Sequence, residues 1–129
     1  MKYLYLVAIF ILGSCASNTT SADDVPAFDQ VKFETAQATE AERKECEAAG
    51  GEVSRTGRLG GDFCLQTYPD EYEVCQSGSD CIGFCYLEDD VSDPKPGTPA
   101  EGVCQATTDS SGCWTLVEDG KIQATICVD

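Results

Sequence analysis

The sequence predicts a small, disulfide-rich α+β domain with one N-terminal helix followed by short β-hairpins. Nine cysteines in 129 residues approach the density that is typical of disulfide scaffolds. A helix-capping pattern is followed by short apolar segments, which are separated by glycine-rich or Asp-Gly turns. The length suits one small domain, which we expect over residues 39–129.

The first fifteen residues have the pattern of an export signal. Lys2 precedes ten consecutive apolar residues, which are too few to cross a bilayer as a helix but suit the apolar region of a signal peptide. The segment ends in Leu12-Gly13-Ser14-Cys15, which resembles the lipobox of bacterial lipoproteins. The resemblance implies a signal peptide over residues 1–14, cleavage before Cys15 and acylation of Cys15.

The resemblance also implies a location. Two or more acyl chains hold a protein stably on a membrane, so we expect a lipid-anchored protein of the bacterial cell envelope. Ala16 and Ser17 follow the lipidated cysteine, and the absence of Asp there favours the outer membrane over the inner one. The alternative is an ordinary secretory signal, which would leave Cys15 among the disulfide-forming cysteines.

Residues 15–38 are expected to form a flexible acidic tether between the lipid and the domain. They are rich in Ser, Thr, Asp and Ala and show little periodicity. The alternative is a short amphipathic segment, built on Val25, Phe28, Val31 and Phe33.

One helix is predicted, over about residues 40–49. Thr39 and Glu42 match a capping box, the residues that follow are strong helix formers, and Gly50 lies where a helix would end. Cys46 is expected on its buried face.

Two hairpins are predicted after the helix. Strands over residues 53–56 and 63–67 flank a glycine-rich turn, and strands over residues 114–117 and 122–128 flank Asp119-Gly120, a strong turn dipeptide.

The segments between the hairpins are predicted to be loops. They are residues 68–86 and the Pro-rich, acidic residues 88–102, after which residues 103–105 are compatible with a brief strand.

The region from Cys46 to Asp70 carries a second resemblance. Its C-x-x-x-G-G pattern, glycine-rich hairpin, Cys64 and Pro-Asp pair resemble a short module of small Cys-rich secreted bacterial proteins that carry a hemolysin label. That label implies no defined activity, and this chain departs from the module by continuing with further cysteines.

Eight cysteines remain when Cys15 is set aside, an even number that suits four disulfides. We expect Cys46 to pair with Cys64 and Cys113 with Cys127, and the middle four to pair among themselves. A zinc site is the alternative, disfavoured by an oxidising compartment and the lack of histidine. The eight disulfide candidates are Cys46, Cys64, Cys75, Cys81, Cys85, Cys104, Cys113 and Cys127.

Composition argues against several classes of function. A net charge of −15 disfavours nucleic-acid binding. The chain has no His, no G-x-S-x-G elbow and no phosphate loop, so we predict no catalytic residue, no cofactor and no metal site. Glu88, Asp89, Asp90 and Asp93 could bind calcium, but they lack EF-hand spacing, and an exposed acidic loop is favoured.

Aromatic side chains offer a further alternative. Tyr68, Tyr72, Tyr86 and Trp114 could stack on sugars, although in so small a core Trp114 is favoured as the central packing residue.

These observations favour a non-enzymatic binding or structural role in the envelope. The expected partners are the membrane, through the lipid, and an envelope component or a basic protein. The alternative is an inhibitor of a basic hydrolase, either a lysozyme or a protease, because rigid loops on an acidic surface suit such a target. A carboxylate-based enzyme is the third hypothesis.

Overall fold

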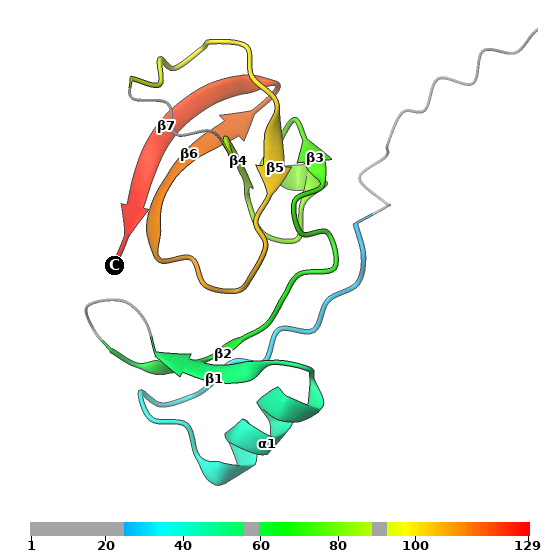
Figure 1. Ribbon diagram of the computed structural model, residues 1–129, viewed down its shortest axis with the longest axis vertical. Coiled ribbons are helices and arrows are strands. Elements are labelled where there is room, and N and C mark those ends of the chain that lie inside the picture. Colours follow the sequence, from blue (N-terminus) through cyan, green and yellow to red (C-terminus); the bar gives the residue numbers. More distant parts are fainter. Residues whose placement is uncertain (1–24, 56–59, 89–92) are drawn as a thin grey trace, which may run out of the picture.

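The computed structural model describes residues 25–55, 60–88 and 93–129, which fold into two β-sheets and one short α-helix (Figure 1). In the first part of the chain, α1 (Glu40–Ala48) packs beside β1 (Glu52–Arg55) and β2 (Asp62–Leu65). The other five strands form one sheet in the order β3-β5-β4-β6-β7. Their bounds are β3 (Val74–Cys75), β4 (Cys85–Tyr86), β5 (Gly102–Cys104), β6 (Gly112–Glu118) and β7 (Lys121–Val128).

The predicted α+β class with an N-terminal helix is wrong. The regular structure of the described residues is mostly β, with seven strands against one α-helix of nine residues. The helix is also not N-terminal, because an extended segment precedes it and runs beside β2 (Figure 1). Strong helix formers are confined to one short run, whereas the cysteine-rich remainder pairs as brief strands.

The position of the helix itself is confirmed, as is its capping box. The Thr39 hydroxyl accepts a hydrogen bond from the Glu42 N–H at 3.3 Å, and the Glu42 carboxylate accepts one from the Thr39 N–H at 2.7 Å. Gly50 has a φ of +77°, as the residue that ends a helix often does. Cys46 is fully buried, as predicted.

Both predicted hairpins are confirmed, with strand ends shifted by one or two residues. Antiparallel pairing joins β1 to β2, and it joins β6 to β7. In the second hairpin, Asp119 and Gly120 have φ values of +50° and +67°, the backbone of a tight two-residue turn. The turn of the first hairpin lies partly outside the described residues.

The predicted loops contain more structure than expected. Residues 68–86 include β3, β4 and a 3-10 turn, Gly78–Asp80. In the sheet, β5 lies between β3 and β4. A two-residue strand has no periodicity that a sequence pattern could reveal. Within residues 88–102, a bridge between Pro99 and Lys121 attaches the loop to the start of β7.

Four disulfides are present, and the expected pairings are confirmed. Cys46 bonds to Cys64 and Cys113 to Cys127. The middle four cysteines pair among themselves, as Cys75–Cys85 and Cys81–Cys104. Each disulfide typically contributes about 2–4 kcal/mol, which is large against a usual total stability of about 5–15 kcal/mol.

The core of the five-stranded sheet consists of these two middle disulfides and Val117, which is 1% exposed. Trp114 is therefore not the central packing residue, and that expectation is wrong. Its half-buried ring packs edge-on against Phe84 and Tyr86, with centroids 5.0 and 4.9 Å away. The cystines occupy the interior that a large aromatic ring would otherwise fill.

Gly102 gives a test of this close packing. A Cβ added there would lie 2.7 Å from the Cys85 Sγ and 2.8 Å from the Tyr86 carbonyl oxygen. We expect Gly102→Ala to lower the free energy of unfolding by about 1–3 kcal/mol in urea titrations. Gly78→Ala is the matched control, since its Cβ would meet only the Glu118 carboxylate at 3.6 Å. Equal stability of the two variants would contradict the packing described.

Candidate functional site

A cleft of about 420 Å³ lies between the β1–β2 sheet, with the segment that precedes the helix, and the five-stranded sheet. This volume falls in the range of about 300–1,000 Å³ that is usual for small-molecule sites. Four segments that are distant in the sequence line the cleft: residues 30–33, 62–64, 108–111 and 128–129. Its lining combines apolar side chains, such as Val31 and Phe63, with hydroxyl and charged groups.

One wall is formed by residues 28–38, called the strap here. The Val31 N–H donates to the Gln66 side-chain oxygen at 2.8 Å, and the Ala36 carbonyl accepts from the Asp62 N–H at 2.9 Å. The Phe28 ring packs edge-on against Tyr68, with centroids 4.8 Å apart. The structure therefore places the second half of the expected tether against the domain, whereas residues 15–24 lie outside the described residues.

The Asp62 carboxylate joins the strap, the hairpin and the helix at the floor of the cleft. It accepts two hydrogen bonds from the Arg55 guanidinium, at 2.7 and 2.9 Å. It also accepts from the Ala38 N–H at 3.0 Å and from Arg43 at 3.2 Å. The Ala38 hydrogen bond, followed by those from Arg55, holds the pKa of Asp62 below its ordinary value.

The opposite wall is fixed by Thr108. Its hydroxyl donates to the Cys64 carbonyl at 2.8 Å and accepts from the Gln66 N–H at 3.0 Å. Next along the chain, the Ser111 hydroxyl donates to the Asp109 carboxylate at 2.7 Å. These bonds orient the hydroxyls of Thr108 and Ser111, and Ser110 is a third hydroxyl-bearing residue in the lining.

The last part of the lining comes from the open end of the β6–β7 hairpin. Ser111 and Val128 both line the cleft, and each is close in sequence to a cysteine of the Cys113–Cys127 disulfide. Apolar surface with a few oriented polar groups suits the binding of an amphipathic molecule. No cysteine thiol is available in this lining, because Cys64 is bonded to Cys46.

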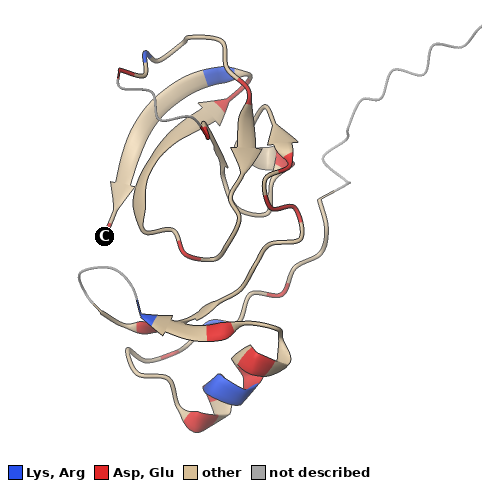
Figure 2. Ribbon diagram, in the orientation of Figure 1, with Lys and Arg blue, Asp and Glu red and all other residues tan. Residues whose placement is uncertain are grey.

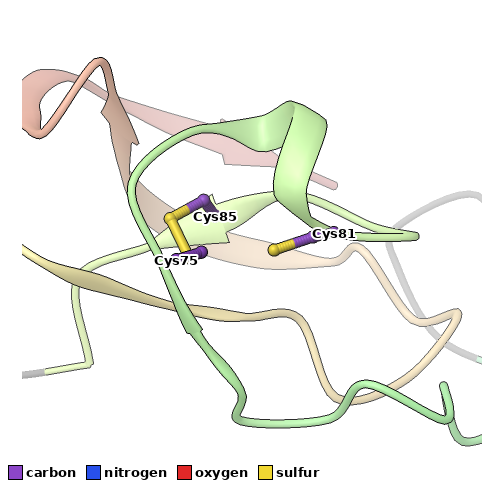
Figure 3. Close-up of side chains that lie close together, drawn as sticks. All are labelled: Cys75, Cys81 and Cys85. Atoms are coloured by element: carbon purple, nitrogen blue, oxygen red, sulfur yellow. A yellow bond between two sulfur atoms is a disulfide. The ribbon is translucent and has the colours of Figure 1, made fainter. Parts of the chain in front are cut away.

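A second cluster of chemical groups lies in the core of the five-stranded sheet. Figure 3 shows the Cys75–Cys85 disulfide with the Cys81 sulfur beside it, and the three Sγ atoms lie within 4.8 Å of one another. This spacing is compatible with a metal, but a metal requires thiolates. All three sulfurs are in disulfides, so the cluster cannot supply thiolates as it stands.

Asp70 lies beside this cluster and was missed by the sequence reasoning. It is 1% exposed, and one of its carboxylate oxygens lies within 4.8 Å of the Cys81 and Cys104 sulfurs. Its Oδ2 accepts from the Ile82 N–H at 2.7 Å, whereas Oδ1 has no hydrogen-bond partner among the described residues. The pKa of the nearby Tyr68 is raised, mainly because the ring is partly buried and to a smaller extent because of the charge of Asp70. The Pro-Asp pair in the sequence indicated only a turn.

The remaining predicted groups are brought together only in part. Tyr86 packs against Trp114 and lies near enough to the exposed Tyr72 to interact with it electrostatically, whereas Tyr68 is buried against Phe28 and stands apart from these three. Cys15 lies outside the described residues, and its lipidation stays a prediction. Asp89 and Asp90, two of the four calcium candidates, also lie outside the described residues. The other two, Glu88 and Asp93, are exposed.

Acidic residues outnumber basic residues along the described chain, and most of them are exposed (Figure 2). Three of the few basic side chains there are in ion pairs: Arg43 and Arg55 with Asp62, and Lys44 with Glu40. A surface of this kind attracts basic proteins. The hydrolase inhibitor considered above stays a prediction.

Comparison with protein-family models, with curated proteins and with solved structures finds no match for this chain. In the part of the chain that the structure describes, no helix is long and apolar enough to cross a bilayer.

The lowered pKa of Asp62 predicts loss of stability in acid. A carboxyl group with a lower pKa in the folded state stabilises the fold above its unfolded-state pKa, and this contribution disappears as the pH falls through the folded-state pKa. We expect the melting temperature to fall below about pH 4, since free aspartate titrates near there. Asp62→Asn should melt lower at pH 7 and show a weaker pH dependence.

The control for Asp62 is Glu71→Gln, which changes an exposed carboxylate in a turn. At each pH between 7 and 3, Glu71→Gln should have the same melting temperature as the wild type. Identical pH profiles for wild type and Asp62→Asn would contradict the role given to Asp62.

Proposed function

We propose that this protein is a lipid-anchored component of the bacterial cell envelope whose domain binds a ligand without chemical turnover. The observation that carries the binding role is the cleft, which the strap, β2 and the β6–β7 hairpin enclose. Disulfides restrain two of its walls, through Cys64 and at Cys113–Cys127. Walls that are already ordered reduce the entropic cost of binding.

The lining supports a small amphipathic ligand. Phe33, Phe63 and Val128 offer apolar surface, while Ser110 offers a hydroxyl group. A peptidoglycan fragment, which combines a sugar, a lactyl group and a short peptide, has this mixture of surfaces. It is also an envelope component, as the proposed location requires.

The anchor rests on the lipobox resemblance at Leu12-Gly13-Ser14-Cys15 and on the arithmetic of the cysteines. The other eight all lie in disulfides, which leaves Cys15 as the odd cysteine. A lone cysteine directly after an apolar signal segment is the acceptor that lipidation needs.

Lipidation is tested by the intact mass of the protein extracted from membranes. We expect Cys15 to carry acyl chains, and eight alkylation sites to appear only after reduction. Cys15→Ser should move the protein from the membrane fraction to the soluble fraction while leaving all four disulfides formed. An unacylated Cys15 on a membrane-bound protein would overturn the anchor.

Binding in the cleft is tested with muramyl dipeptide as the probe, by following backbone amide shifts. We expect shifts confined to residues 30–33, 62–64 and 108–111. Ser110→Trp should weaken binding at least about tenfold, because Ser110 is exposed at the cleft and a bulky side chain there would fill it.

The matched control is Thr98→Trp, which adds the same ring to an exposed loop far from the lining. It should leave the affinity unchanged. Saturable shifts outside the lining would place the ligand elsewhere, and an absence of shifts at millimolar probe would exclude this ligand class.

A further inference from the structure

The Cys113–Cys127 disulfide differs from the other three in its exposure to solvent. Both of its residues are exposed, whereas each of the six other bonded cysteines is at most 7% exposed. It joins β6 to β7 at the open end of their hairpin, far from the Asp119-Gly120 turn. A thiol reagent in solution therefore reaches this disulfide without unfolding the protein.

We propose that Cys113–Cys127 is a thiol–disulfide exchange site, which a dithiol reductant opens while the other three disulfides stay closed. A thiolate of the reductant attacks one sulfur of the pair, and the other sulfur leaves as a thiolate. The second thiol of the reductant then attacks the mixed disulfide. The dithiol is oxidised to a disulfide, and Cys113 and Cys127 are reduced to two thiols.

The position of β7 gives the attacking thiol its access. β7 is the edge strand of the five-stranded sheet, and in the described residues only the 97–99 loop covers its outer side, near Lys121 and Ile122. At the end that carries Cys127, no strand of the described residues pairs with the outer edge of β7. Accessible disulfides are more often the labile or regulatory ones than buried disulfides are.

The hairpin has enough other interactions to stay folded once this disulfide is open. Val117 and Ile122 are 1% and 5% exposed and fix the end near the turn. Further along, the hydroxyls of Thr115 and Thr125 lie 2.8 Å apart across the strands. Reduction therefore releases the end of the hairpin rather than the core.

The charge of the chain restricts the class of reductant. At a net charge of −15, the protein repels small anionic thiols such as glutathione. A dithiol protein with a neutral or basic surface around its active site meets no such barrier. We therefore assign the reductant to the class of thioredoxin-like dithiol proteins.

Opening the disulfide has a local consequence at the cleft. Ser111 and Val128, which flank the two cysteines, both line it. The disulfide holds the two cleft segments together, and after its reduction only the strand pairing near Gly112 and Val128 still joins them. The exchange itself holds whether or not the cleft binds the ligand class proposed above.

The test is timed reduction of the full-length native protein with dithiothreitol, followed by acid quenching, alkylation and peptide mapping. We expect Cys113 and Cys127 to be alkylated at least about tenfold faster than any other pair, with the far-UV spectrum retained. In guanidinium all four disulfides should open at comparable rates. Equal rates in the native protein, or cooperative loss of all four, would overturn the proposal.

Two further measurements separate exchange from a general loss of structure. Cys113→Ser/Cys127→Ser should lack the fast phase while the other disulfides open at unchanged rates. A thioredoxin-type reductase whose resolving cysteine is replaced by serine should trap a mixed disulfide on Cys113 or Cys127. Trapping on any other cysteine, or no trapping, would overturn the assignment of the reductant.

Discussion

A pair of disulfides that interleave in the sequence, Cys75–Cys85 and Cys81–Cys104, is the constraint on which the five-stranded sheet depends. Three of its strands have only two or three residues, which is too short to be stable through pairing alone. Cys75–Cys85 ties β3 to β4, and Cys81–Cys104 ties β5 to the end of the 3-10 turn. These cystines occupy the interior, and Val117 is the one large aliphatic side chain fully buried in this cluster of described residues. Covalent bonds thus replace the apolar burial that a chain of this size and charge cannot supply.

The junction between the two sheets depends on a different kind of interaction. The Thr108 hydroxyl connects them by accepting from the Gln66 N–H and donating to the Cys64 carbonyl, and the Thr108 N–H donates to the Gln66 carbonyl. The strap then covers β2 and meets the Asp62 carboxylate. No disulfide crosses between the two sheets among the described residues, so these polar contacts fix the geometry of the cleft. Because one of them involves the titratable Asp62 carboxylate, the shape of the cleft is more sensitive to pH than the cystine core is.

Features set by neighbouring residues could be predicted from the sequence, and features set by distant contacts could not. The capping box at Thr39 located the helix, and Asp119-Gly120 located the last hairpin. The strands β3 and β4 exist only through pairing with distant partners, and the strap is ordered by Gln66 rather than by its own composition. No local signal predicts the cleft, because four separated segments contribute to it.

The outer side of β7 has a consequence for the behaviour of the protein in solution. From Gln123 to Val128 the strand carries no charged side chain, and Ile126 and Val128 are each 40% exposed. An uncharged open edge is a template for pairing with the same strand of another copy. The strong negative charge of the chain opposes such contacts, and that repulsion vanishes near the isoelectric point of about 4.1. Colloidal stability is thus governed by pH and ionic strength, and it can fail while every disulfide is still intact.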